Sequence, residues 1–280
     1  MRLGREYPEF DIGKVGLELL LNRLRQRPGG LTREEFANMR PEIEEAARFG
    51  SHAAMMVLGE ELQKSEPAAS FGWYCAAAAD GDALAMRQAG LMLSNGDGPP
   101  IDLPKAFFYL SAAADKDEPN ATAALADCYL FGFGTEKNEK RAIALLQKAS
   151  DAGNARAKNR LGDCHHKGLG VPRNDREAFR LFSEAAQRGN AEAIGNLGVL
   201  YMNGEGVAKD PAKAVEKLKE ASLKGDVNSM FYYARCLEKG LGTKASLTGA
   251  TTWFQKAAEA GHAEAATWCK TQGVRFKPAK

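Results

Sequence analysis

The chain has 280 residues, with 38 Lys or Arg against 36 Asp or Glu, and a formal net charge of +2. This balance gives no reason to expect a nucleic-acid partner, which calls for a clustered basic surface. No run of about 18 apolar residues is present, so no membrane insertion is expected.

The N-terminal region has no clear export signal. Its most apolar stretch, residues 15–21, contains Glu18 and is followed by Arg23 and Arg25. A signal peptide has a plain apolar core and a small-residue cleavage site. We therefore expect a cytoplasmic protein, whereas a leader already removed would make it periplasmic or secreted.

Residues 1–50 are interpreted as N-terminal capping helices. One helix is expected near 13–26. Another begins at the capping box Thr32-Arg33-Glu34-Glu35 and ends at Gly50. We expect Pro41 to kink or restart this second helix, because proline lacks the N–H that a helix interior uses.

A glycine pattern then recurs every 36 residues. Each instance is a G-x-G pair, and the pairs stand at Gly96/Gly98, Gly132/Gly134, Gly168/Gly170, Gly204/Gly206 and Gly240/Gly242. A fixed period of this length indicates a stack of one helical or mixed supersecondary unit, in which each unit contacts its neighbours.

Each unit is predicted to hold two helices, called A and B. Helix A precedes the G-x-G pair, and helix B follows an N-cap residue. The N-cap column is Asp102, Asn138, Asn174, Asp210 and Ser246. Helix B ends at a glycine suited to left-handed backbone: Gly81, Gly153, Gly189, Gly225 and Gly261, with Asp117 replacing glycine once.

A column of small residues runs through helix A. Its members are Gly59, Gly90, Ala126, Gly162, Gly198 and Ala234. Glycine inside a helix costs about 1 kcal/mol relative to alanine. The column therefore predicts close helix–helix approach.

These columns define six helix pairs: residues 51–81, 82–117, 118–153, 154–189, 190–225 and 226–261. The first pair lacks the G-x-G loop, and Ser65-Glu66-Pro67 makes a tighter turn there. Residues 262–280 are interpreted as a C-terminal capping helix and tail. Lys270 occupies the small column in this helix, as suits a polar end cap, and Val274 and Phe276 are expected to fold back over it.

The combination of Leu161-Gly162, Gly168-Leu169-Gly170-Val171, Asn174, Ala178 and residues 184–191 (EAAQRGNA) resembles the Sel-one-like repeat (SLR) family, a relative of the tetratricopeptide repeat. The resemblance covers about residues 51–273. It implies an all-α, right-handed α/α superhelical solenoid. It also implies a bacterial adaptor or scaffold that binds a partner protein or peptide and is not an enzyme.

By analogy with tetratricopeptide repeats, helix A lines a concave face, and its outward positions are candidates for partner binding. The residues chosen are Arg87, Asn95, Asp127, Asn159, Asp163, His166, Asn203 and Arg235. Their asparagines and mixed charges suit an extended peptide or a helical tail. A merely solvated surface is the competing interpretation.

The run Asp163-Cys164-His165-His166 invites a metal hypothesis. Consecutive helical residues point about 100° apart, so these four side chains do not converge as zinc requires. No metal or cofactor is predicted, and Asp163 is expected to pair with His166. Cys128, Cys164 and Cys236 share a column with Leu200, which indicates buried reduced thiols. The G-x-G loops lack the strand context of a phosphate-binding loop.

Two alternatives stay open beside the scaffold. One is a hydrolase of the cysteine-rich SLR type, acting on β-lactam or cell-wall-like substrates. The regular paired cysteines of that subgroup are missing here, and no catalytic constellation is evident. The other is a regulatory subunit of a separate enzyme. The sequence does not decide the oligomeric state.

Overall fold

The computed structural model describes residues 16, 19–23 and 31–277. Within these residues the chain is all-helical and contains no strand. The helices from α3 onward form two compact units, residues 1–137 and 138–280. The expected all-α class is confirmed.

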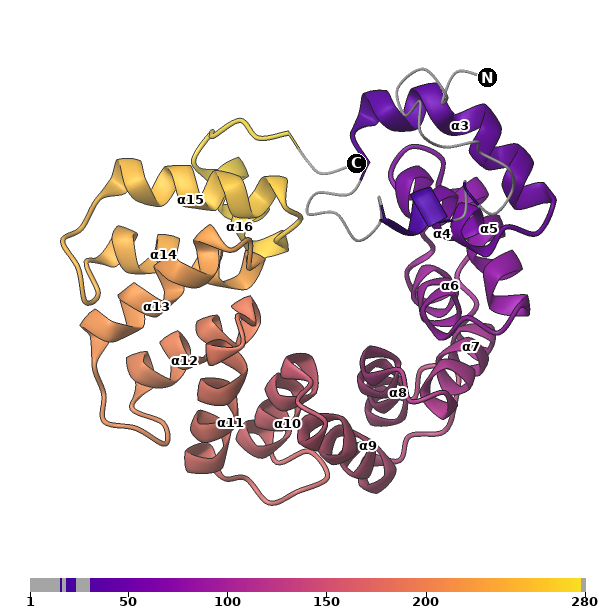
Figure 1. Ribbon diagram of the computed structural model, residues 1–280. Helices are drawn as coiled ribbons and strands as arrows, with labels where there is room; N and C mark the ends of the chain where they lie inside the picture. The colour runs from indigo at the N-terminus through magenta and orange to yellow at the C-terminus, as the bar shows by residue number, and fades with distance from the viewer. Residues whose placement is uncertain (1–15, 17–18, 24–30, 278–280) are drawn as a thin grey trace. The chain divides into compact units, whose positions relative to one another are not determined.

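Unit 1 contains α3 (Arg33–Arg48), α4 (His52–Leu62), α5 (Pro67–Ala79), α6 (Ala83–Asn95), α7 (Leu103–Asp115) and α8 (Pro119–Phe131). Even-numbered helices from α4 are the predicted A helices, and α5 and α7 are B helices. Within the unit each helix from α4 to α7 packs on the one before and the one after (Figure 1).

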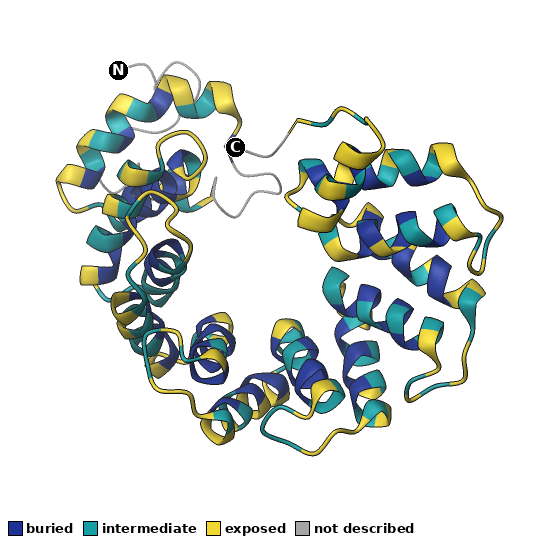
Figure 2. Cartoon of the chain, turned by 180° about the vertical axis from the view of Figure 1, so that it is seen from behind, coloured by how far each residue is buried: buried dark blue, intermediate teal, exposed yellow. Residues whose placement is uncertain are grey.

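Unit 2 contains α9 (Glu139–Asp151), α10 (Ala155–Lys167), α11 (Asp175–Gln187), α12 (Ala191–Asn203), α13 (Pro211–Leu223), α14 (Val227–Lys239), α15 (Leu247–Glu259) and α16 (Ala263–Thr271). Within the unit, each helix packs on the one next to it along the chain, from α9 on α10 to α15 on α16, and the A helices α12 and α14 also contact each other. Buried residues lie on the helices, while the loops between them are half-buried or exposed (Figure 2).

Helix α3 begins as expected at its capping box. The Thr32 side chain accepts from the Glu35 N–H, and the Glu35 side chain accepts from the Thr32 N–H. The expected restart at Pro41 is wrong, because α3 continues through this proline to Arg48. Loss of one N–H does not end a helix whose apolar side, including Met39 and Ile43, is buried against neighbours. The helix expected near 13–26 lies largely outside the described residues.

Capping at the helix junctions follows the predicted columns. All five predicted N-caps of helix B accept a first-turn N–H, as Asn174 does from Glu177. The residue that follows the last glycine of a repeat bonds both to the helix before it and to the helix after it, as Asn190 shows. The Asn190 N–H donates to the Ala185 carbonyl at the end of α11, and its side chain accepts from the Ala193 N–H at the start of α12. One residue therefore ends one helix and begins the next.

The helix A glycines allow the close packing that the sequence predicted. A Cβ added at Gly162 would lie 2.6 Å from Cε1 of Phe182, and one at Gly198 would lie 2.8 Å from Cγ of Leu218. The same contact pairs Gly59 with Tyr74 and Gly90 with Leu110. In these four repeats, a large side chain of helix B thus occupies the space that the glycine leaves.

The G-x-G loops have a second role that the sequence did not reveal. The first glycine is a left-handed C-cap of helix A, as Gly204 is for α12. The second glycine packs on the first residue of the preceding B helix. A Cβ at Gly206 would lie 2.1 Å from the carbonyl oxygen of Asp175. The equivalent contacts are Gly98 on Pro67, Gly134 on Leu103, Gly170 on Glu139 and Gly242 on Pro211. Each loop therefore binds two successive repeats together.

The C-terminal end is closed by α16 and the segment after it. Lys270 is exposed, whereas Val274 and Phe276 are half-buried against the last core cluster. Trp268 stacks on Phe254 with ring centroids 4.1 Å apart. The predicted fold-back of the tail is confirmed.

The cysteines are free, as predicted. Cys128, Cys164 and Cys236 are buried in the repeat cores. Burial raises the pKa of the Cys128 and Cys236 thiols to about 11, so they stay protonated at neutral pH.

Candidate functional site

A buried polar group lies on the A helices of unit 2. Asn159 on α10 is 1% exposed and Asp163, one turn later, is 8% exposed. The Asn196 side-chain amide on α12 donates to Oδ1 of Asn159 at 3.1 Å and to Oδ1 of Asp163 at 3.3 Å. Arg160 Nη1 donates to Oδ2 of Asp163 at 3.1 Å. These bonds compensate the desolvation of the polar atoms and join repeat 4 to repeat 5.

Repeat packing does not require polar residues at these positions. The position of Asn159 is occupied by Ala123, Gly195 and Phe231 in neighbouring repeats. The position of Asp163 is occupied by Asp127 in the preceding repeat and by Val199 in the next one. A buried carboxylate costs free energy that an apolar side chain does not. The repeat fold therefore does not require this polar group, and its hydrogen-bonded combination of Asn159, Asp163 and Asn196 is specific to repeats 4 and 5.

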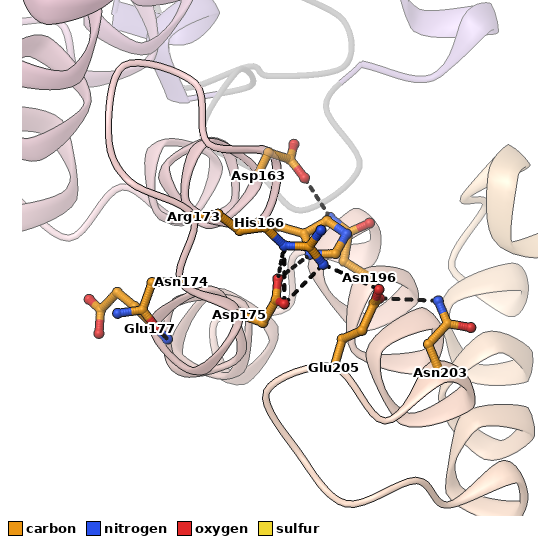
Figure 3. A network of polar contacts seen from close by, with 9 residues as sticks. All are labelled: Asp163, His166, Arg173, Asn174, Asp175, Glu177, Asn196, Asn203 and Glu205. Carbon is orange, nitrogen blue, oxygen red and sulfur yellow. Dashed lines mark hydrogen bonds and ion pairs between the residues drawn. The ribbon is translucent and has the colours of Figure 1, made fainter.

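His166 pairs differently from the prediction. Its Nδ1 lies 2.9 Å from Oδ1 of Asp175, the first residue of α11. The expected Asp163–His166 pair is wrong, because Asp163 is turned toward Asn196 and Arg160 (Figure 3). The guanidinium of Arg173, followed by His166, holds the pKa of Asp175 below its usual range.

A series of polar contacts continues from the His166–Asp175 pair across the loops of repeats 4 and 5. Arg173 donates to both carboxylate oxygens of Asp175, and its Nη2 lies 3.4 Å from Oε1 of Glu205. The Asn203 amide donates to Oε2 of Glu205 at 3.1 Å (Figure 3). Asn203 and Arg173 are exposed. These contacts place polar groups at the C-terminal ends of the A helices α10 and α12.

Glu192 lies in the first turn of α12. It is half-buried and has no hydrogen bond or ion pair to another described residue. Burial raises the pKa of this carboxyl, and the charges of Asp163 and Asp226 add to the shift, while Arg160 and Arg156 oppose it. Burial likewise raises the pKa of Asp163 despite its Arg160 partner.

The A helices of repeat 6 and of the C-terminal cap add a cationic and aromatic group to this polar surface. Arg235 on α14 is half-buried, lies over the Phe231 ring at 5.7 Å and approaches Oε2 of Glu238 at 3.8 Å. The Trp268 indole on α16 donates to Oε1 of Glu238 at 2.9 Å. We call Asn159, Asp163, His166, Glu192, Asn196, Asn203 and Arg235 the helix A face of unit 2.

The remaining predicted residues lie in unit 1. Arg87 on α6 is half-buried, with its Nε 3.4 Å from Oε2 of Glu118, the N-cap of α8. Asn95 is exposed and donates to Asp97 at 3.1 Å. Asp127 is half-buried on α8. These three residues are not joined to one another by any hydrogen bond or ion pair that we find in the described part of unit 1.

The expectation that these positions all face solvent is wrong for Asn159 and Asp163, which are buried. Sequence reasoning also missed Arg160, Glu192 and Asn196. They stand two and six residues before the small column, where Gln88 and Arg156 are also polar. The sequence signal for these three residues was their polarity, because they lie on sides of helix A that were taken as packing surface.

We find no group of three or more His, Cys, Asp or Glu placed to hold a metal within the residues described here. Nor is any helix among them long and apolar enough to cross a membrane. His165 and Cys164, the other members of the sequence run, point away from the Asp163 contacts because consecutive helical residues diverge.

Comparison with known families gives a match over most of the chain. The Sel1 repeat model matches residues 53–82, 83–118, 119–154, 155–190, 191–226 and 227–262. The chain belongs to the Sel1 repeat family. The resemblance inferred from the glycine and alanine columns is confirmed. No match was found among curated proteins.

Solved structures agree with this assignment. A Sel1 repeat protein from Oxalobacter formigenes is 26% identical, with 76% of this chain and 87% of that chain covered and a TM-score of 0.64. A protective antigen of uropathogenic Escherichia coli with an SLR fold is 25% identical, with 95% and 59% covered and a TM-score of 0.62. The chain thus spans less than two thirds of the length of that antigen.

A more distant neighbour is an immunity protein from Pseudomonas aeruginosa. It is 23% identical, with 66% of this chain and 68% of that chain covered and a TM-score of 0.51. At this identity the likeness concerns the fold alone.

Proposed function

We propose that this protein is a non-catalytic interaction scaffold that binds a segment of a partner polypeptide along the helix A face of unit 2. Sel1 repeat proteins are typically scaffolds for protein interaction. The observation that carries the proposal is the buried, hydrogen-bonded pair of Asn159 and Asp163, which the Asn196 amide joins to the next repeat. Repeats 3, 5 and 6 have Ala123, Gly195 and Phe231 at the position of Asn159.

The face has the groups that recognise a polypeptide backbone. Asn203 offers an exposed amide, which both donates and accepts hydrogen bonds. Glu192 and Arg235 add one half-buried charge of each sign. Because Asp163 and Asn159 are fixed by Asn196 and Arg160, this surface is organised before a partner arrives, which lowers the entropy cost of binding.

The proposal is tested by affinity capture from lysate of the source cells, read by mass spectrometry. The face variant combines Glu192→Ala, Asn203→Ala and Arg235→Ala. A matched control combines Glu216→Ala, Gln187→Ala and Arg176→Ala, which are exposed residues on the B helices of the same unit. Both variants are checked for folding by thermal melting.

A partner retained by the wild type and the control but lost by the face variant supports the proposal. Loss from both variants, or retention by both, contradicts it. If the retained partner is an enzyme, its activity with and without this chain distinguishes a regulatory subunit from a passive scaffold. Turnover of a β-lactam by the purified chain would contradict the non-catalytic part of the proposal.

A further inference from the structure

The first repeat differs from the others in its α4–α5 turn and in the helix α3 that precedes it, and these two parts lie next to each other. It lacks the G-x-G loop, so that α4 passes to α5 through the short turn Gln63–Glu66. The helix before it, α3, has 16 residues where the B helices α5 to α15 have 13. Phe36 on α3 stands 31 residues before Pro67, the same shortened spacing that separates Gly50 from Gly81.

This alignment identifies what the missing loop would have covered. In the five repeats that have a loop, its second glycine lies against the first residue of the preceding B helix, as Gly98 does against Pro67. In the first repeat the equivalent position on the preceding helix is Phe36. No loop of the repeat itself reaches this position, because the residues that would form it are deleted.

A cavity of about 660 Å³ lies at this place. Its walls are Arg33 and Phe36 of α3, Glu60 and Glu61 of α4, and the turn residues Gln63–Ser65. The volume is within the usual range of ligand-binding pockets. Beside the cavity, an ion pair joins α3 to the α4–α5 turn where the other repeats have a loop. Arg40 of α3 binds both carboxylate oxygens of Glu66 at 2.6 and 2.9 Å.

The charges in the cavity indicate what an occupant needs. Glu61 is half-buried and makes no hydrogen bond or ion pair with another described residue. Arg33 and Lys64 are exposed, so water already solvates their charges. Burial, together with the charge of Glu60, raises the pKa of Glu61. A cationic group in the cavity would compensate this carboxylate.

We propose that the cavity between α3 and the α4–α5 turn binds a glycine-containing turn of a partner polypeptide, with a Lys or Arg side chain of that turn directed at Glu61. We call the surface of α3 at Phe36, where a loop glycine would pack, the glycine seat. The five loops of this chain show what such a seat accepts, because each places a glycine backbone where a Cβ would collide. The proposal does not rest on the helix A face of unit 2, so either can fail without the other.

The seat itself is tested by restoring the loop. The sequence Asp-Gly-Pro-Pro-Ile of residues 97–101 is inserted between Ser65 and Glu66, and a matched insert has valine in place of its glycine. Both inserts disturb the Arg40–Glu66 pair equally. We expect the valine insert to melt roughly 4 °C lower than the glycine insert. Equal melting temperatures would show that no glycine seat exists and would overturn the proposal.

The partner is tested by a photoreactive benzoylphenylalanine in place of Gln63 of the full chain in the source cells, with Asn38 of α3 as the control position. We expect a cross-link from position 63 only. It should map to a glycine turn of another polypeptide with Lys or Arg within three residues. The glycine insert should abolish it, and Glu61→Gln should weaken it roughly threefold.

A cross-link to residues of this same chain would overturn the proposal, because the chain would then fill its own cavity. A cross-linked segment without a glycine turn would overturn it as well. So would the absence of any cross-link from position 63 to another polypeptide.

Discussion

At the scale of single residues, backbone requirements were readable from the sequence and side-chain partners were not. Gly162 recurs at a fixed position because Phe182 leaves no room for a Cβ. Asp117, with φ of 58°, adopts the left-handed region as expected at a glycine position. The partner of His166, in contrast, is Asp175 beyond the loop. Spacing along one helix cannot reveal such a contact, because the path of the loop decides it.

The close approach at Gly162 predicts opposite effects for two Gly→Ala changes. Gly162→Ala places a Cβ 2.6 Å from the Phe182 ring and should lower the free energy of unfolding by about 1–3 kcal/mol. Gly72→Ala in α5 meets nothing within 4 Å and should raise it by about 0.5–1 kcal/mol. Urea unfolding measures both, and equal effects would contradict the packing argument.

The environment of Glu192 predicts a pH-dependent gain in stability on neutralisation. Its pKa is raised in the folded protein, so its ionised form is less favourable there than in the unfolded chain. This penalty is present above the folded pKa and disappears as pH falls through that value toward the unfolded one. Glu192→Gln should therefore melt higher than the wild type at pH 7.5.

The advantage of Glu192→Gln should shrink as pH falls to the ordinary glutamate value of 4.5. Melting temperatures of the two proteins at pH 7.5, 6 and 4.5 follow this difference. An advantage that grows toward acid pH would mean that the carboxylate stabilises the fold. Glu216→Gln on the exposed side of α13 is the matched control.

At the scale of elements, the boundaries of the A and B helices followed from N-cap, alanine and glycine columns. The role of the G-x-G loop was only half visible. Its helix-ending function is local and belongs to Gly204 with φ of 79°. The contact of Gly206 with Asp175 joins different repeats. A fixed glycine spacing does not distinguish a residue needed for its own φ from one needed for a neighbour's backbone.

The two loop glycines should therefore respond differently to alanine. Gly204→Ala would bring its Cβ within 3.0 Å of the Lys209 Cβ and 3.4 Å of the Lys209 backbone nitrogen, and it carries the strain of its positive φ. Gly206→Ala has similar strain and also places a Cβ 2.1 Å from a backbone oxygen. We expect a cost of about 1 kcal/mol for Gly204→Ala and about 3 kcal/mol or more for Gly206→Ala.

Hydrogen exchange would locate the damage. Amides of α11 and α12 should lose protection in Gly206→Ala, since the loop of repeat 5 no longer fits against α11. Protection in Gly204→Ala should fall mainly near the end of α12. The same exchange pattern in both variants would show that the loops do not link the repeats.

At the scale of the whole molecule, the period of 36 residues was sufficient to predict a stacked helical array, and the family match agrees. The period is informative because most repeats share the same N-caps, helix-ending glycines and close helix contacts. It says nothing of the residues that differ between repeats. Asn159 and Asn196 differ from their counterparts in the other repeats, and only their hydrogen bonds in three dimensions reveal a buried group with Asp163.

The central claim is that the helix A face of unit 2 holds the partner. The most direct measurement is hydrogen–deuterium exchange of the full chain with and without the captured partner. The account predicts slower exchange in α10, α12 and α14 on binding, with α11, α13 and α15 unchanged. Protection confined to the B helices, or absent from unit 2, would contradict it.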